Sequence, residues 1–264
     1  MKVFVFDGSK CNGCYNCQLA CKDETVGNDW LPYSLSQPEV GHFWCKVQET
    51  THGQTPRVRV EYKPMLCNHC ENAPCIEAFP EVIYKREDGL VIIDPIKAKG
   101  VEGIEDACPY GYIYYNDDLG IAQKCTGCAH LVDRGEVPHC VDLCVSGALR
   151  FGDYEEFADE LKDAEFFVDP AVGPHVYYIN LPHLFVAGDV WDPEEDEIIE
   201  GAKVTIEGEG VSRTELTDDY GDFWFRGLLP GSYHLSIAAE GFKGRELDIE
   251  LTESLNVGDF PLEK

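Results

Sequence analysis

The segment at residues 11–21, CNGCYNCQLAC, carries four cysteines in the spacing Cys11-x2-Cys14-x2-Cys17-x3-Cys21. Three thiolates separated by two residues each can hold three iron corners of one cubane. A fourth, three residues later, begins a helix that turns away toward a second cluster. A zinc site would use two pairs of ligands at knuckle spacing and would not need this run. The segment therefore favours iron–sulfur chemistry over zinc or an unmetallated core.

A second run of four cysteines has the spacing Cys125-x2-Cys128-x11-Cys140-x3-Cys144. If the first three cysteines of the early run take a distant fourth ligand, Cys144 is the natural donor, and Cys21 joins the later run. This is the reciprocal exchange of two-cluster ferredoxins, although Val145 stands where a bacterial ferredoxin carries proline. The predicted ligand sets are Cys11, Cys14, Cys17 and Cys144 for cluster 1, and Cys21, Cys125, Cys128 and Cys140 for cluster 2.

A third set lies between the two runs, where Cys67-x2-Cys70-x4-Cys75 is followed later by Cys108-Pro109. The predicted ligands of cluster 3 are Cys67, Cys70, Cys75 and Cys108. The sets use all but one of the thirteen cysteines, which predicts three [4Fe–4S] clusters. The remaining cysteine, Cys45, lies in the aromatic stretch HFWCKV, and we predict a small buried hydrophobe there.

Clusters held by four cysteines leave no open site for a substrate, so the ligand sets predict one-electron transfer rather than catalysis. Two nearby residues have alternative interpretations. Lys124, beside Cys125, either raises a cluster's reduction potential through its charge or is an ordinary solvated side chain. His69, inside the Cys67–Cys70 loop, either bonds to the cluster or packs beside it, and the complete ligand set favours packing.

The charge balance is strongly acidic, with 21 Lys and Arg against 49 Asp and Glu and a formal net charge of −28. Nucleic acids and anionic membrane surfaces are bound mainly through cations, so neither is an expected partner. No apolar run approaches the roughly 20 residues of a membrane span. The first ten residues, MKVFVFDGSK, read as a short strand rather than a signal peptide.

The chain divides by composition into a cysteine-rich part and a tail without cysteine. We expect an α+β fold with a cluster-binding domain at residues 1–152 (with an insertion at about 23–63), a helix and connector at 153–183, and a β-sandwich at 184–264. Asp153 and Glu156 predict a capping box for a helix through Lys162. In the tail, alternation places Ala202, Val204 and Ile206 on one face, and Tyr233, Leu235 and Ile237 on another.

With the motifs CNHCENAPC, CPYGYIYYN, QKCTGCAH and VSGALRFGD, these spacings resemble the iron–sulfur subunits of the dimethyl sulfoxide reductase family of molybdopterin enzymes. The resemblance covers about residues 1–155 and implies a ferredoxin-like domain. Members commonly carry four clusters, and this chain departs from that pattern. Phe79-Pro80 stands in place of Cys-Pro, and Ala98, Val101 and Ile104 stand at ligand positions ahead of Cys108. One whole cubane is therefore predicted to be missing.

Over its whole length the chain is most similar to small subunits of molybdopterin enzymes acting on phenols, of the pyrogallol–phloroglucinol transhydroxylase or catechol dehydroxylase type. The tail resembles transthyretin-like and carboxypeptidase-regulatory-like sandwiches through GAKVTIEG and GSYHLSIAAEGF. The resemblance implies a large partner subunit that holds molybdenum or tungsten on molybdopterin guanine dinucleotide and performs the catalysis. No catalytic residue is then expected in this chain.

The resemblance also implies a cytoplasmic protein without direct membrane contact, although export with a signal-bearing partner stays open. Two other functions remain as alternatives. The protein is either a free acidic polyferredoxin that docks on several partners, or an electron-transfer subunit of another enzyme of the same family. A third interpretation treats the clusters as structural staples. Reversible reduction of the clusters would exclude that one.

Overall fold

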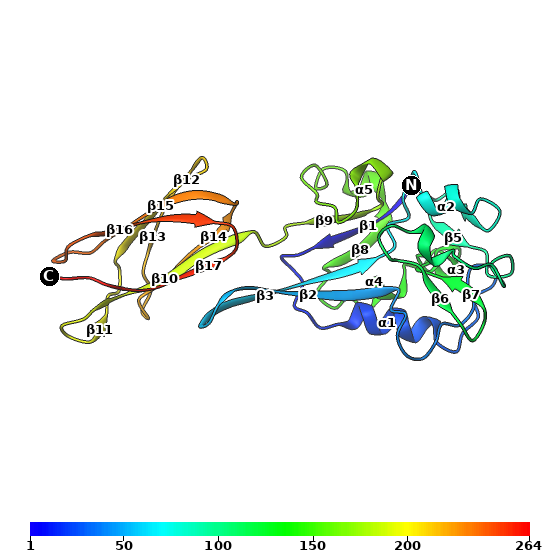
Figure 1. The fold of residues 1–264 in the computed structure, drawn as a ribbon, viewed down its shortest axis with the longest axis horizontal. Coiled ribbons are helices and arrows are strands. Elements are labelled where there is room, and N and C mark those ends of the chain that lie inside the picture. Colours follow the sequence, from blue (N-terminus) through cyan, green and yellow to red (C-terminus); the bar gives the residue numbers. More distant parts are fainter. The chain divides into compact units, whose positions relative to one another are not determined.

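The computed structural model describes residues 1–264, which form two compact units (Figure 1). Unit 1 contains Met1–Glu49 and Tyr62–Leu181, and unit 2 contains Thr50–Glu61 and Pro182–Lys264. None of the helices has the length and hydrophobicity that crossing a membrane requires.

A three-stranded sheet with the order β8-β1-β9 forms the centre of unit 1. Its strands are β1 (Lys2–Asp7), β8 (Leu149–Asp153) and β9 (Val176–Ile179). β1 lies antiparallel to β8 and parallel to β9, and it is buried on both faces. Val3 and Val5 pack on one face, whereas Phe4 and Phe6 pack on the other, against a core that contains several of the cysteines. The predicted N-terminal strand is confirmed.

The other regular secondary structure before β9 consists of three hairpins and several short helices. The hairpins are β2 (Cys45–Gln54) with β3 (Arg57–Leu66), β4 (Ile83–Lys85) with β5 (Val91–Ile93), and β6 (Tyr114–Asn116) with β7 (Ile121–Gln123). The helices are α1 (Asn16–Thr25), α2 (Pro74–Ala78), α3 (Ala129–Val132), α4 (His139–Asp142) and α5 (Tyr154–Phe157), with single 3-10 turns η1 (Glu105–Ala107) and η2 (Pro170–Val172).

The helix expected from Asp153 to Lys162 is shorter than predicted. The capping box between Asp153 and Glu156 is present, but α5 ends at Phe157. Beyond it, Glu160 pairs with Arg150 of β8 at 2.7 Å, and Leu161 is buried in the core beside β1. Because the turn lets Leu161 reach this core, tertiary packing overrides the local preference for helix.

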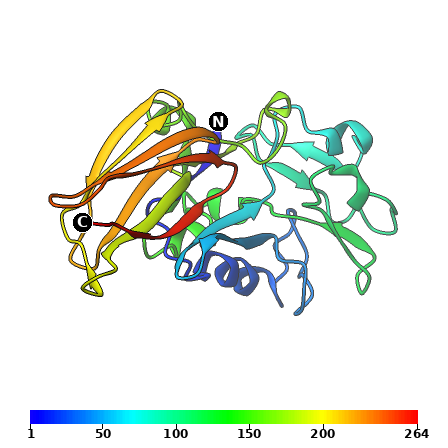
Figure 2. The ribbon, with the colours of Figure 1, turned by 60° about the vertical axis from the view of Figure 1, so that its left-hand side comes forward.

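Unit 2 contains a sandwich of two four-stranded sheets, which face each other in Figure 2. The first has the order β11-β10-β14, with β17 also paired to β10, and consists of β10 (Leu184–Asp192), β11 (Glu197–Ile198), β14 (Asp222–Leu228) and β17 (Leu255–Pro261). The second has the order β13-β12-β15-β16 and consists of β12 (Lys203–Gly208), β13 (Val211–Leu216), β15 (Gly231–Ala238) and β16 (Arg245–Leu251).

The alternation predicted for the tail is confirmed by burial. Each residue of the two predicted apolar faces is at most 2% exposed: Ala202, Val204, Ile206, Tyr233, Leu235 and Ile237. These side chains form one core with Phe223 and Phe225 of the opposite sheet. The sandwich is therefore closed by apolar packing between its two inner faces.

The tip of the β2–β3 hairpin, residues 50–61, belongs to unit 2 rather than to the cysteine-rich part. The Arg57 guanidinium is 8% exposed and pairs with Asp189 at 2.7 Å and with Asp222. Gln54 hydrogen-bonds to the main chain of Ser254 and Asn256 at 3.2 and 2.8 Å. The expected insertion at about 23–63 is thus divided between the two units.

Candidate metal centres

All thirteen cysteines are free thiols, and the mutual influence of their charges divides twelve of them into three groups of four. The first group is Cys11, Cys14, Cys17 and Cys144, and it is the most exposed of the three. Burial raises the pKa of Cys11, and the neighbouring thiols of the group raise it further. Leu149 donates its main-chain N–H to Cys144 Sγ at 3.2 Å. The loop before α1, the first turn of α1 and the turn after α4 supply these side chains.

The second group, Cys21, Cys125, Cys128 and Cys140, is completely buried. Burial raises the pKa of Cys21 well above its usual range, and the three other thiols add to this effect. The pKa of Cys125 rises to about 12, mainly through burial, while the N–H of Gly127 donates to its sulfur at 3.3 Å. Packing of α1 against α4 brings Cys21 and Cys140 together.

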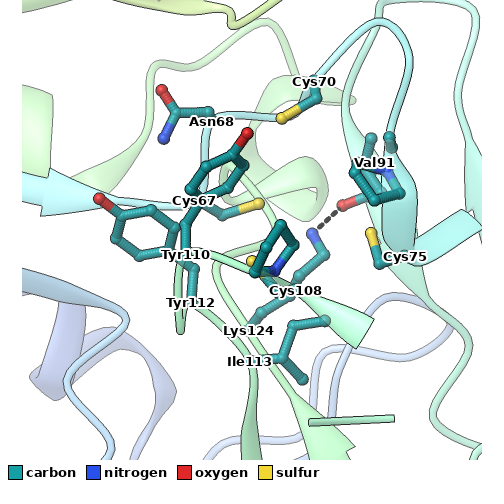
Figure 3. A pocket seen from close by; sticks show the side chains of 13 residues that line it. Cys67, Asn68, Cys70, Cys75, Val91, Cys108, Tyr110, Tyr112, Ile113 and Lys124 are labelled. Carbon is teal, nitrogen blue, oxygen red and sulfur yellow. Dashed lines mark hydrogen bonds between the residues drawn. The ribbon is translucent and has the colours of Figure 1, made fainter. Parts of the chain in front are cut away.

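The third group, Cys67, Cys70, Cys75 and Cys108, lines one small pocket in which all four side chains are gathered (Figure 3). The pKa of Cys70 is raised to about 12, mainly by burial and in addition by the charges of the three other thiols. The loop after β3, helix α2 and the residue that follows η1 supply the four sulfurs.

Lys124 lies in the same pocket and is 2% exposed, so the interpretation as a solvated side chain is wrong. Its ammonium group donates to the carbonyl oxygens of Val91 (the dashed line in Figure 3) and of Cys125, the latter at 3.0 Å. The charge of Lys124 counteracts part of the effect of burial on the pKa of Cys75. A buried cation therefore faces the third group of thiols.

The three groups of thiols lie next to one another in the order first, second, third. After burial, the largest influence on the pKa of Cys125 in the second group comes from Cys67 in the third. Cys45 is buried in the core that contains Cys21 and Cys140 of the second group, and Cys17 of the first group packs against the same core. These neighbours place the second group between the first and the third.

The donor sets fit iron–sulfur clusters. Burial raises the pKa values of these thiols, and the charges of neighbouring thiolates add to the effect, so a cation is needed to stabilise the thiolates together. Metal ions supply that charge and deprotonate their thiol ligands. No three His, Cys, Asp or Glu side chains are placed to hold one metal ion. In a cubane each cysteine binds a different iron atom, so its four sulfurs need not meet at one point.

His69 is buried, and its ring stacks on that of Phe4 with the centroids 6.2 Å apart. Its Nδ1 accepts the main-chain N–H of Val91 at 2.9 Å, and burial lowers its pKa well below the usual range. The ring is therefore neutral, and one of its nitrogens is already occupied. His69 is not among the residues that line the pocket of the third group.

Four positions at which related subunits would carry the ligands of a fourth cluster lie in one apolar core of this chain. Ala98 and Ile104 are completely buried, and Phe79 and Val101 pack against the same cluster of side chains. Cys70 and Cys75 of the third group belong to this core as well. Apolar side chains thus fill the region around these four positions.

Two features of the site were not predicted from the sequence. Cys45 is buried, as predicted, but its packing in the same core as Cys21 and Cys140 was missed. The predicted N-terminal strand and the aromatic run around Cys45 indicate buried strands, yet neither indicates what a strand packs against. The sequence also left open whether Lys124 is buried, because it does not show which residues surround that side chain.

Two domain families match the chain. The 4Fe-4S dicluster domain matches residues 58–154, and the carboxypeptidase regulatory-like domain matches residues 186–263. The chain thus combines an iron–sulfur domain with an all-β domain, as the sequence indicates.

Similar proteins are subunits of oxidoreductases and of a hydroxytransferase. The chain is 38% identical over 251 residues to the pyrogallol hydroxytransferase small subunit of Pelobacter acidigallici, and the match covers 90% of each protein. It is 32% identical to a tetrathionate reductase subunit of Salmonella typhimurium, over 70% of this chain and 74% of that one. It is 36% identical to a subunit of the anaerobic dimethyl sulfoxide reductase of Escherichia coli, over 61% and 77%.

The length of these matches and the three groups of cysteines together establish the family to which this chain belongs. A relative at 38% identity is covered over 90% of its own length, so the likeness includes both the cysteine-rich part and the sandwich. This protein belongs to the electron-transfer iron–sulfur subunits of the dimethyl sulfoxide reductase family of molybdopterin enzymes.

Proposed function

We propose that this chain carries three [4Fe–4S] clusters and passes single electrons to or from a large catalytic subunit. Clusters 1, 2 and 3 use the first, second and third groups of thiols, within a ferredoxin-like domain at residues 1–152. Residues 153–183 lead from it to the sandwich at 184–264, and β9 within them pairs with β1 in the central sheet of unit 1. The observation that carries the proposal is the arrangement of twelve thiols in three consecutive groups of four.

The residues of this chain would bind the clusters, exclude water and adjust their potentials. The clusters supply one-electron exchange when bound. Main-chain N–H groups that donate to Cys125 and Cys144 stabilise charge on the sulfurs. Catalysis takes place in the large partner, on molybdenum or tungsten held by molybdopterin guanine dinucleotide, and no catalytic residue lies in this chain.

We further propose that the partner acts on polyhydroxylated aromatic compounds. The support is the pyrogallol hydroxytransferase small subunit, which matches along nearly the whole chain, including the sandwich. Transhydroxylation causes no net redox change, whereas reductive dehydroxylation needs the clusters as an electron inlet. We place the complex in the cytoplasm, with no direct membrane contact and no nucleic acid partner.

A free polyferredoxin is the second candidate function. The net charge of −28 favours it, since a strongly charged surface accelerates docking on oppositely charged partners. The sandwich and the Arg57-anchored hairpin tip favour the subunit, because a free carrier needs neither.

Anaerobic purification of the protein from its native host tests both candidates. We expect about twelve iron atoms per chain, from three cubanes, and molybdenum or tungsten in the same gel-filtration peak as a larger protein. A chain that elutes alone with its iron would favour the free carrier. About sixteen iron atoms would mean that a fourth cluster exists, and zinc in place of iron would contradict the cluster assignment.

A further inference from the structure

The tip of the β2–β3 hairpin covers part of the outer face of the first sandwich sheet. Val186 and Val190 of β10 belong to the inner core, so Phe185 and Asp189, which alternate with them, face the other side. Phe185 is nevertheless 1% exposed. No side chain fits at Gly53 of the tip, because its Cβ would overlap the Phe185 ring. The backbone of the tip therefore lies directly on this face.

A single guanidinium group connects the tip to three neighbouring strands of the sheet. Arg57 pairs with Asp189 of β10 at 2.7 Å and with Asp222 of β14. Its Nη1 also donates to the side chain of Asn256 in β17 at 3.4 Å. The Arg57 side chain is 8% exposed, so these contacts are largely shielded from water. The planar guanidinium has several donors in fixed directions, which suits an acceptor on each of three strands.

The side chain of Gln54 adds a second polar contact at the start of β17. Its amide donates to the main-chain carbonyl of Ser254 at 3.2 Å and accepts the main-chain N–H of Asn256 at 2.8 Å. Both hydrogen-bonding groups of the amide are therefore used on one short segment of main chain. Such a pair of contacts fixes the position of the tip along the strand as well as across the sheet.

We propose that the face formed by β14, β10 and β17 is a binding site for the hairpin tip at residues 50–61, and that this site keeps the sandwich attached through the hairpin even without the linker at residues 182–183. The ligand class is an arginine-bearing β-hairpin tip, recognised by two carboxylates and an amide. The inference goes beyond the proposed function, because it concerns the sandwich and needs no cluster.

The path of the chain makes this site an attachment point. The chain passes from one unit to the other at residues 49–50, 61–62 and 181–182. The first two passages are the strands of one hairpin, which begins at Cys45 and ends at Leu66 in unit 1. If the third passage is cut, the tip stays covalently joined to unit 1. The contacts of Arg57, Gln54 and Gly53 then remain to hold the sandwich.

The test is cleavage of the complete protein at a protease recognition sequence inserted at His183, which is exposed. After cleavage, we expect both pieces to elute from gel filtration as one peak, and a dilution series gives their dissociation constant. In Arg57→Met the affinity should fall about thirtyfold or more, because truncating one partner of a desolvated charge pair leaves the other charges unpaired. Separate peaks in the cleaved wild-type protein would overturn the proposed site.

Two further variants separate recognition from folding. The double variant Asp189→Asn, Asp222→Asn removes the charges with little change in shape, and it repeats the measurement if Arg57→Met does not fold. Arg213→Met is the matched control, because this arginine also donates within the sandwich, at 2.7 Å to the carbonyl of Arg226, but it lies on the second sheet.

The control should keep the wild-type affinity, and the iron content should be the same in all variants. An unchanged affinity in both Arg57→Met and the double variant would overturn the assignment of the ion pairs. Equal weakening in Arg213→Met would mean that any loss of stability in the sandwich releases it, which would overturn specific recognition of the tip.

Discussion

Replacing Cys108 by serine is expected to remove cluster 3 alone and to lower the iron content from about twelve toward eight atoms per chain. Cys108 follows η1, far in the sequence from the three other thiols of its pocket, and no further cysteine lines that pocket. A hydroxyl group remains protonated at neutral pH and is a poor ligand for iron. Iron analysis and electron paramagnetic resonance of the reduced protein measure the loss.

The matched control for this prediction is Cys45→Ser, the same chemical change at a cysteine outside the three groups. It should keep about twelve iron atoms. If Cys108→Ser instead abolished the signal of the cluster that contains Cys125, the assignment of Cys108 would be wrong. If it lowered all three signals together, the groups would assemble as one cooperative unit.

Local cysteine spacing carries most of the information about the ligand sets. Runs such as residues 11–21 constrain their own geometry, because cysteines separated by two residues reach adjacent corners of a cluster. The assignments of Cys21 and Cys144 between two runs depend on the topology, and the resemblance to two-cluster ferredoxins provided it. The structure brings both residues to the expected neighbours through the packing of α1 on α4.

Burial of polar residues could not be read from the sequence in the same way. Lys124 and Arg57 look like surface residues by type, and each is buried because residues distant in sequence surround it. Val91 accepts from Lys124 across a separation of 33 residues, and Asp189 pairs with Arg57 across 132. Periodicity reports which face of a strand is apolar, but it does not report which strand lies opposite.

The same limit explains the division of the chain. The alternating pattern correctly predicts which side chains of residues 202–206 and 233–237 are buried in the sandwich. The hairpin tip at residues 50–61 shows no such signal, since its membership in unit 2 depends on Arg57 and on hydrogen bonds from the Gln54 side chain to the main chain of residues 254 and 256. The tip contacts the sandwich through polar side chains. A sequence with such polar residues cannot be distinguished from that of an exposed turn.

Removing the charge of Lys124 is expected to lower the potential of cluster 3 most, that of cluster 2 less, and that of cluster 1 least. The ammonium group lies in the pocket of cluster 3, and its charge favours ionisation of Cys75 in that pocket and of Cys125 in cluster 2. A reduced cluster carries one more negative charge, so a nearby cation stabilises it more than the oxidised form. In Lys124→Met we expect the potential of cluster 3 to fall by about 60 mV or more, since about 59 mV corresponds to a tenfold change for one electron.

Lys124→Arg separates charge from packing. It retains the cation and donors for the carbonyl groups of Val91 and Cys125, so most of the potential of cluster 3 should return. Equal shifts in the methionine and arginine variants would mean that the shape of the pocket, and not its charge, sets the potential. A shift confined to cluster 2 would mean that the ammonium group acts through Cys125. The order of the three shifts therefore tests the position of the cation between the clusters.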